Sequence, residues 1–266
     1  IPGGGIVWAQ RKAVRLLAPL NGAEQQMVFR AYAPTSGQRI RVEASGEPVA
    51  DISLAEGWRD YEVTLPAGVV QEGLNEVWLR FGSLTPASQV RLSDRSLGQT
   101  GVQSPVNLVA HSAGQEVGNF GHIYVDGEDV SPNERGYNVV VIHPQTGAVE
   151  QTAAFDTHLD AAASEELATF LDATPDGRIV AVAASDEASR LLGENAVAAL
   201  RRIGAQEDLR DRFRWGHAII GVQGAAPGTA LEATGWMRPV VVVSGEGATE
   251  PELAAAFAGI VFSANR

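Results

Sequence analysis

Alternation of hydrophobic and polar residues dominates the first hundred residues. The stretch 75–82 is the clearest case, because Val77, Leu79 and Phe81 share one face while polar or larger side chains lie on the other. Turn signals such as Asn21-Gly22 separate the runs of this kind. The runs expected to form strands are 26–33, 38–44, 58–65 and 75–82. Short strands with regular turns predict an antiparallel, jelly-roll-like β-sandwich.

The second half mixes strand patterns with helical ones. Apolar residues recur with a period near 3.6 in 161–171 and 194–203, which predicts two helices. Ser185 is expected to cap a further short helix that ends at Gly193, and a last short helix is expected to start near Pro251. The strands expected here are 122–126, 137–143, 148–155, 178–184, 217–222 and 239–243, and Asp126-Gly127 is expected to form a hairpin turn. The fold class is therefore mainly β, with an α+β second part.

A change of composition marks the expected domain boundary. The stretch 83–104 is polar and rich in Ser, Gly, Gln and Thr, whereas regular patterns resume after it. Boundaries between domains fall in such segments. We therefore expect a sandwich at 1–104 and a second domain at 105–266.

Charge and composition narrow the classes of partner. The 266 residues carry a formal net charge of −12 with a mean hydropathy near zero (−0.03), which indicates a globular chain and disfavours nucleic acid and anionic membranes. There is no cysteine, which excludes disulfides and thiolate chemistry. No apolar run reaches the roughly 20 residues that span a bilayer. The start Ile1-Pro2-Gly3 suggests a processed piece, so a tether outside this sequence is expected.

An ordered series of short strings in the second half resembles the interleukin-like EMT inducer family, also called the GG-domain family. The strings are Gly121 to Val125, Gly136 to Val141, Thr146-Gly147, Phe155 to Thr157, Gly177 to Val180, Asp186 to Ala188, Leu200 to Gly204, Phe213 to Trp215 and Ile220 to Ala225. The resemblance implies a compact ββα fold of two antiparallel sheets with flanking helices. It also implies an extracytoplasmic recognition module, with sugar binding in at least one branch. Animal members carry disulfides that this sequence lacks, which favours a bacterial, surface-associated version. Segments 57–61 and 73–76 of the first domain resemble jelly-roll modules of bacterial surface proteins.

The same resemblance points to a candidate ligand site at Asp186, Arg214 and Trp215. In the sugar-binding branch an acidic residue and an arginine in these two strings hold the ligand. A carboxylate and a planar guanidinium together offer the acceptors and donors that sugar hydroxyls require, and Trp215 would add an apolar face. The alternative is a plain Asp–Arg ion pair or a carboxylate at the start of a helix, in either case without a ligand.

Catalytic patterns are weak throughout. Asp156, His158 and Asp160 would share one face of an extended segment, as a metal site or an oriented base requires, but Asp160 as a helix cap is the simpler interpretation. His111 and Ser112 with Asp156 lack the spacing of a hydrolase triad, because neighbouring strand residues point to opposite faces. We therefore expect no enzymatic activity, no cofactor and no metal.

Two functions remain open at this stage. The first is a non-catalytic extracytoplasmic module, periplasmic or on the cell surface, that binds glycan or glycoprotein. The alternative is a structural accessory subunit that docks on a larger membrane-associated or envelope complex. Trp78 is expected to be exposed and able to stack on a sugar or a protein, whereas Trp8, Trp58 and Trp236 are interpreted as core or rim residues.

Overall fold

The structure is a computed structural model that describes residues 5–264. The chain divides into two compact units, which are Ile1–Val90 together with Glu250–Arg266, and Arg91–Thr249. This division differs from the expected boundary at residue 104. The first part of the first unit ends at Val90, and the chain returns to this unit at Glu250, after the second unit.

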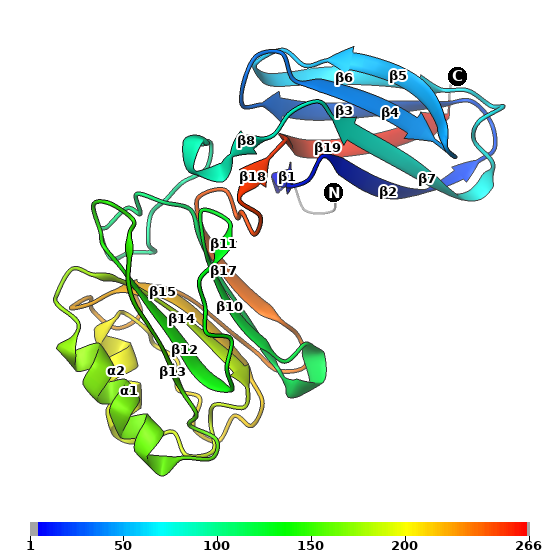
Figure 1. Ribbon diagram of the computed structural model, residues 1–266. Helices are drawn as coiled ribbons and strands as arrows, with labels where there is room; N and C mark the ends of the chain where they lie inside the picture. Colours follow the sequence, from blue (N-terminus) through cyan, green and yellow to red (C-terminus); the bar gives the residue numbers. More distant parts are fainter. Residues whose placement is uncertain (1–4, 265–266) are drawn as a thin grey trace. The chain divides into compact units, whose positions relative to one another are not determined.

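The first unit is a sandwich of two four-stranded sheets, with strand orders β1-β19-β3-β6 and β2-β7-β4-β5 (Figure 1). All pairs within the two sheets are antiparallel. The strands are β1 Val7–Ala9, β2 Ala13–Asn21, β3 Gln25–Ala33, β4 Arg39–Ala44, β5 Glu47–Ser53, β6 Gly57–Leu65, β7 Glu72–Phe81 and β19 Ala255–Ala264. Eight strands that cross between two sheets in this way form a jelly roll, as the sequence predicts.

Period-2 alternation explains the core of the sandwich. In β7, Val77, Leu79 and Phe81 are buried between the sheets, while Arg80 faces solvent. Phe29 of β3 contacts Phe257 of β19, with ring centroids 5.9 Å apart. The core therefore joins residues from both ends of the chain.

The position of β19 corrects the expected assignment of 105–266 to a single domain. β19 pairs with β1 on one side and with β3 on the other, so it is an inner strand of the sandwich. A short ribbon of β8 (Thr85–Pro86) and β18 (Glu252–Leu253) precedes it, where the sequence suggested a last helix near Pro251. That helix prediction was wrong, because the segment pairs as a strand. The second unit is thus inserted between the seventh and eighth strands of the jelly roll.

The second unit has one nine-stranded sheet and two helices. Its strands are β9 Leu108–Gly114, β10 Phe120–Val125, β11 Glu128–Asp129, β12 Gly136–Ile142, β13 Val149–Phe155, β14 Ile179–Asp186, β15 Gly216–Val222, β16 Leu231–Gly235 and β17 Val240–Ser244. Its helices are α1 Ala161–Ala173 and α2 Glu194–Arg202, with a short 3-10 turn η2 at Gln115–Val117. None of the helices among residues 5–264 is long and apolar enough to cross a membrane.

Strand β14 lies at the centre of this unit and is buried on both faces. Val180, Val182 and Ala184 pack toward α1 and α2, while Ala181 and Ala183 pack toward β9, β10 and β17. The continuous apolar run predicted from the sequence reflects this double burial. The helices therefore cover one face of the sheet around β14, and the part of the same sheet around β9 packs on the other face. This arrangement agrees with the expected α+β class of the second unit.

Local sequence signals are confirmed at two points of the second unit and fail at a third. Asp160 caps α1 by accepting a hydrogen bond from the Ala162 amide at 2.8 Å. Asp126 and Gly127, both with positive φ, form the tight turn between β10 and β11. The helix expected from Ser185 to Gly193 does not form, because Ser185 and Asp186 continue β14 and pair with β9.

Candidate functional site

Asp186 and Arg214 lie on either side of Gly114. Asp186 ends β14 and pairs in parallel with Gly114 at the end of β9. The carbonyl oxygen of Arg214 lies so close to Gly114 that a β-carbon there would approach it to 1.9 Å. The missing side chain of Gly114 thus allows the backbones of both residues to lie close to the end of β9.

The backbone is unusual at both residues. Asp186 and Arg214 each have φ 60, in the left-handed region that residues other than glycine seldom adopt. Such conformations cost free energy and persist where the surroundings fix them, often at ligand sites. The two side chains are therefore held in directions that an ordinary strand end would not give them.

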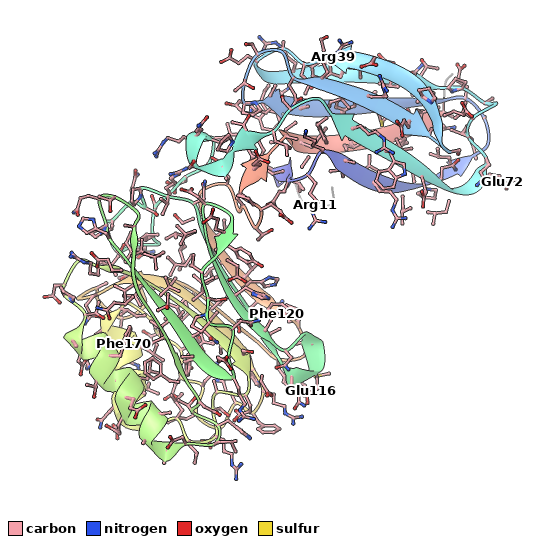
Figure 2. All side chains as sticks on the ribbon, in the orientation of Figure 1. Arg11, Arg39, Glu72, Glu116, Phe120 and Phe170 are labelled. Atoms are coloured by element: carbon pink, nitrogen blue, oxygen red, sulfur yellow. The ribbon has the colours of Figure 1, made fainter. Side chains whose placement is uncertain are left out.

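The guanidinium of Arg214 is only partly satisfied. One terminal nitrogen, Nη1, pairs with the carboxylate of Glu116 in η2 (labelled in Figure 2). Its Nε is buried and has no hydrogen-bond partner among the residues that the structure describes. Arg214 also lies 4.7 Å above the ring of Phe213. The direct partner of Arg214 is therefore Glu116, and the ion pair with Asp186 that the sequence left open is replaced by this one.

Asp186 belongs to an acidic border of the site. Its charge, together with those of Asp156 and Glu187, raises the pKa of Arg135, for which the largest cause is the hydrogen bond to Asp156. The side chain of Asp186 is half-buried, whereas that of the next residue, Glu187, is buried. The strand end thus presents one accessible carboxylate.

Glu187 fixes the loop that follows Asp186. Its carboxylate accepts hydrogen bonds from the amides of Ser189 and Arg190 and contacts His158 Nδ1 at 2.7 Å. Burial alone would raise the pKa of Glu187, but these hydrogen bonds hold it below its ordinary value. A loop anchored in this way keeps Asp186 in place without the helix that the sequence suggested.

Trp215 contributes less open surface than expected. Its ring packs against the core on the helix side, and the guanidinium of Arg212 lies 5.0 Å from its centroid. The open aromatic surface nearby comes from other residues, namely Phe213, 53% exposed, and Trp236, 62% exposed.

Trp236 was interpreted as a core or rim residue, and its exposure places it on the rim. It follows β16, whose Gly235 pairs with Gly216 directly after Trp215, so Trp236 lies at the same end of the unit. Met237, 55% exposed and with positive φ, continues this apolar turn. The sequence analysis did not identify Trp236 as part of the candidate site because β16, the strand that precedes it, was not predicted.

A buried polar network of Tyr137, His217 and Glu232 lies beneath the end of the unit that carries Arg214 and Trp236. His217 Nε2 lies 2.7 Å from Glu232 Oε1, and His217 Nδ1 lies 3.1 Å from the hydroxyl of Tyr137. Burial would raise the pKa of Glu232, yet His217 and the amides of Gln206 and Glu207 lower it. These contacts hold His217, near the start of β15, in place, and they thereby help to position Arg214 three residues earlier.

The residues considered for catalysis or metal binding have structural contacts. Ser112 donates to the carbonyl of Ala184 and accepts from the amide of His217, inside the protein. Asp156 is held by Arg135 at 2.7 Å, and His158 by Glu187. Within residues 5–264 no group of three or more His, Cys, Asp or Glu side chains is arranged to hold a metal ion. His111, Ser112 and Asp156 do not form a triad in this arrangement.

Comparison with known proteins agrees with the resemblance seen in the sequence. Residues 135–225 match the model of the interleukin-like EMT inducer family. This match spans β12 through β15 with both helices, so it includes Asp186, Arg214 and Trp215.

Two relatives, one human and one from mouse, are named cell migration-inducing and hyaluronan-binding protein. The human protein is 39% identical over 98 residues, which is 37% of this chain and 7% of that protein. The mouse protein is 35% identical over 127 residues, which is 48% of this chain and 9% of that protein. The chain therefore spans less than a tenth of the length of these relatives.

Among solved structures, an FMN-binding beta-glucuronidase from Facaelibacterium prausnitzii aligns over 88% of this chain and 31% of its own, with 8% identity and a TM-score of 0.20. A likeness at this level supports no argument about fold or function. Residues 135–225 of the second unit thus match the interleukin-like EMT inducer family, and the chain is homologous over part of its length to proteins named for hyaluronan binding.

Proposed function

We propose that this chain is a non-catalytic extracytoplasmic recognition module that binds a glycan at the end of the second unit, between Asp186 and Arg214. The observation that carries the proposal is the convergence of these two residues on Gly114, both in the left-handed conformation, with the Nε of Arg214 buried and unpartnered among the described residues. A sugar hydroxyl at this point would accept from the guanidinium and donate to the carboxylate.

The surroundings favour a neutral sugar unit. Glu116, Asp156 and Asp186 place carboxylates around the guanidiniums of Arg214 and Arg135. These carboxylates repel anions. Phe213 and Trp236 supply exposed aromatic surface on which the apolar face of a sugar ring can stack. The ligand class is therefore a neutral hexose or N-acetylhexosamine within a glycan or glycoprotein. The relatives named for hyaluronan binding support a glycan ligand.

The absence of catalysis is part of the proposal. The buried hydroxyl of Ser112 and the ion-paired Asp156 are engaged in the fold, so neither is free to attack or to activate a substrate. The wild-type chain is expected to leave ester, glycoside and phosphate substrates unchanged, and turnover that disappears on mutating His111, His158 or Asp156 would contradict this.

A glycan array followed by calorimetry tests the binding site. Arg214→Ala is expected to abolish binding, and Arg214→Lys to weaken it strongly, because an ammonium cannot reproduce the planar fork of donors. Both variants should remain folded, since a pair as exposed as Arg214–Glu116 contributes only about 0–1 kcal/mol.

Arg210→Ala is the matched control, because Arg210 is also ion-paired and partly exposed but pairs with Asp208 outside the site. Binding by Arg214→Ala at wild-type affinity would show that the site lies elsewhere. An array on which no neutral glycan binds would contradict the proposed ligand class.

A second candidate function, an accessory subunit of a larger membrane-associated or envelope complex, rests on one sheet face of the second unit. Val241 and Val243 of β17 are 49% and 40% exposed beside β9, and Phe120 (labelled in Figure 2) belongs to β10 on the other side of β9. An apolar sheet face of this kind suits a protein partner. Purification from the native source with a stoichiometric partner, lost in Val241→Glu, would support it.

A further inference from the structure

The outer face of the sheet β2-β7-β4-β5 in the first unit gathers arginines, although the chain as a whole has a net charge of −12. Arg41 of β4 lies opposite Arg80 of β7, and Arg15 of β2 lies opposite Trp78 of β7. Arg39 lies two residues before Arg41 on the same face, because strand side chains alternate. Four guanidiniums thus share three neighbouring strands.

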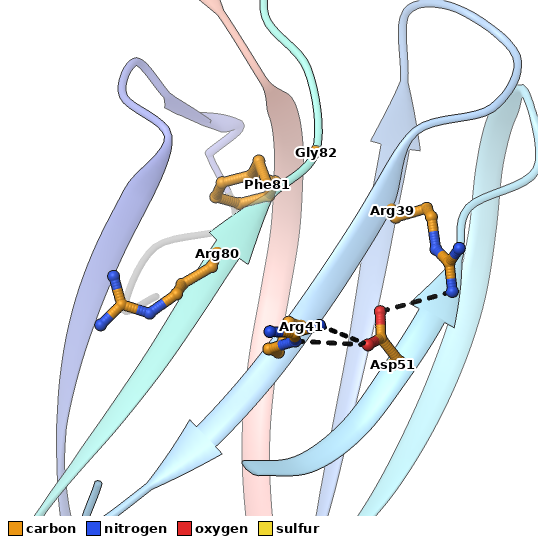
Figure 3. Close-up of a pocket in the computed structure, with 6 residues that line it drawn as sticks. All are labelled: Arg39, Arg41, Asp51, Arg80, Phe81 and Gly82. Carbon is orange, nitrogen blue, oxygen red and sulfur yellow. Dashed lines mark hydrogen bonds and ion pairs between the residues drawn. The ribbon is translucent and has the colours of Figure 1, made fainter. Parts of the chain in front are cut away.

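A hollow of about 360 Å³ lies among three of these arginines (Figure 3). It is lined by Arg39, Arg41, Asp51, Arg80, Phe81 and Gly82. Gly82 has only a hydrogen where the outward-facing position next to Arg39 would otherwise carry a side chain. The hollow therefore exists because the sequence places glycine directly after β7, and its size is at the lower end of ligand pockets.

Three carboxylates pair with the four arginines, because Glu76 pairs with Arg15, Glu43 with Arg80, and Asp51 with both others, so one positive charge is left unbalanced. Asp51 is shared between Arg41, at 3.2 Å, and Arg39, at 3.6 Å, and these separations are long for charged pairs. Arg39 and Arg41 keep 62% and 57% of their side-chain surface exposed. One carboxylate between two guanidiniums leaves donors directed at solvent within the hollow.

Trp78 extends the face toward β2. Its indole lies under two guanidiniums, 5.3 Å from that of Arg80 and 6.0 Å from that of Arg15, and it is half-buried. The sequence suggested an open stacking surface at Trp78, but the arginines occupy its flanks. Trp78 instead holds Arg80 and Arg15 in place by cation–π contact, which lowers the entropy that they lose when a ligand binds.

We infer that this face of the jelly roll is a second, independent glycan-binding site that takes acidic polysaccharide. A uronate carboxylate would enter the hollow and receive paired N–H donors from Arg39 and Arg41, while Asp51 would accept from neighbouring sugar hydroxyls. Across β2, β7 and β4 the arginines extend over two strand spacings, about 10 Å, which suits an elongated ligand rather than a single ion.

Other anions fit this face less well. Asp51 and Glu43 lie within the arginine cluster, and Glu43 pairs with Arg80 at 2.7 Å. These carboxylates repel a phosphate dianion or a nucleic-acid backbone more strongly than a single carboxylate charge. An acidic peptide offers carboxylates too, but it lacks the dense hydroxyls that Asp51 could bind, so it serves as a competing ligand in the test.

The test measures binding of a hyaluronan octasaccharide, in which a uronate alternates with a neutral N-acetylhexosamine, to the full chain by calorimetry. The double variant Arg39→Gln/Arg41→Gln is expected to weaken binding at least about tenfold, and raising the salt concentration should weaken wild-type binding as well. The matched control is Arg30→Gln, because Arg30 is ion-paired to Asp60 on the outer face of the opposite sheet and is similarly exposed.

Asp51→Asn is expected to change the affinity for the octasaccharide in the opposite direction. Asparagine keeps an oxygen that accepts from sugar hydroxyls, but it removes the charge that Arg39 and Arg41 share, so this variant should bind the octasaccharide more tightly, by roughly threefold or more. A purely structural role for the Arg39–Asp51–Arg41 cluster predicts the reverse. Wild-type-like or weaker binding by Asp51→Asn would overturn the inference.

Three further ligands and one further variant separate the alternatives. A carboxyl-reduced octasaccharide, inorganic phosphate and poly-glutamate should each bind more weakly than the octasaccharide, and equal binding of any of them contradicts an acidic-polysaccharide site. Arg214→Ala should lose the neutral glycan while keeping the Arg39-dependent part of octasaccharide binding. The two proposed binding sites can therefore be tested, and contradicted, independently of each other.

Discussion

At the scale of single residues, Gly114 decides the geometry of the candidate site in the second unit. Its φ of −65 is ordinary, so alanine would be tolerated by the backbone itself. The conflict is steric, because the new β-carbon would lie 1.9 Å from the carbonyl oxygen of Arg214.

We expect Gly114→Ala to push Arg214 away from Asp186, to abolish glycan binding and to cost about 1–3 kcal/mol of stability. Chemical denaturation and calorimetry measure the two effects. Gly68→Ala, where no atom lies within 4 Å of the new carbon, is the control and should change neither. Unchanged binding in Gly114→Ala would separate Arg214 from the ligand.

Glu232, which contacts His217, gives the second unit a dependence on pH. The folded-state pKa of Glu232 lies below its ordinary value of 4.5, so its contribution to stability is present above that value and is lost as the pH falls through the folded pKa. We expect the unit to lose stability on acidification below about pH 4.5. In Glu232→Gln the unit should be less stable at neutral pH by about 1–3 kcal/mol and should show a smaller acid-dependent loss. Urea unfolding between pH 3 and 7 measures both, and an identical pH profile in the variant would assign the acid sensitivity to other groups.

At the scale of elements, the last strand controls the fold of the first unit. Phe257 of β19 is buried and contacts Phe29 and Phe81, which lie far from it in sequence. Phe257→Ala is expected to destabilise the sandwich by about 3–5 kcal/mol while leaving the second unit intact, because the cavity forms only in the sandwich core. Hydrogen exchange resolved by segment measures this, with Val261→Ala as the control, since Val261 is 63% exposed on the same strand. Loss of protection in 91–249 instead of in the sandwich would contradict the assignment of β19.

At the scale of the whole molecule, the second unit is an insertion joined to the sandwich by two chain connections, near residues 90 and 250. We expect limited proteolysis at these two connections to release a folded piece close to 91–249, because domain boundaries are more accessible than the cores on either side. Mass spectrometry of the first products identifies the cuts. A cut only near residue 104, as the composition of the sequence suggested, would leave the inserted arrangement without support.

The two proposed binding sites also belong to this scale. The second unit offers an acidic, aromatic site suited to a neutral sugar, and the first offers an arginine hollow suited to a uronate. A polysaccharide that alternates neutral and acidic units carries both chemistries. The family match covers residues 135–225 of the second unit, and the arginine hollow lies in the first unit, outside that match, so it has to be tested directly.

The sequence by itself determined the features that depend on neighbours along the chain. Alternation of period 2 predicted the strands around Val77, Asp160 was identified as a cap and Asp126-Gly127 as a turn, because each rests on contacts within a few residues. The ordered strings also pointed to Asp186 and Arg214. Only the tertiary structure decided that β19 completes the sandwich, that Asp186 ends a strand rather than starting a helix, and that Glu116 pairs with Arg214. The reason is physical: an apolar strand can fill a gap in any sheet, and the partner that fills it is set by long-range packing that local pattern does not encode.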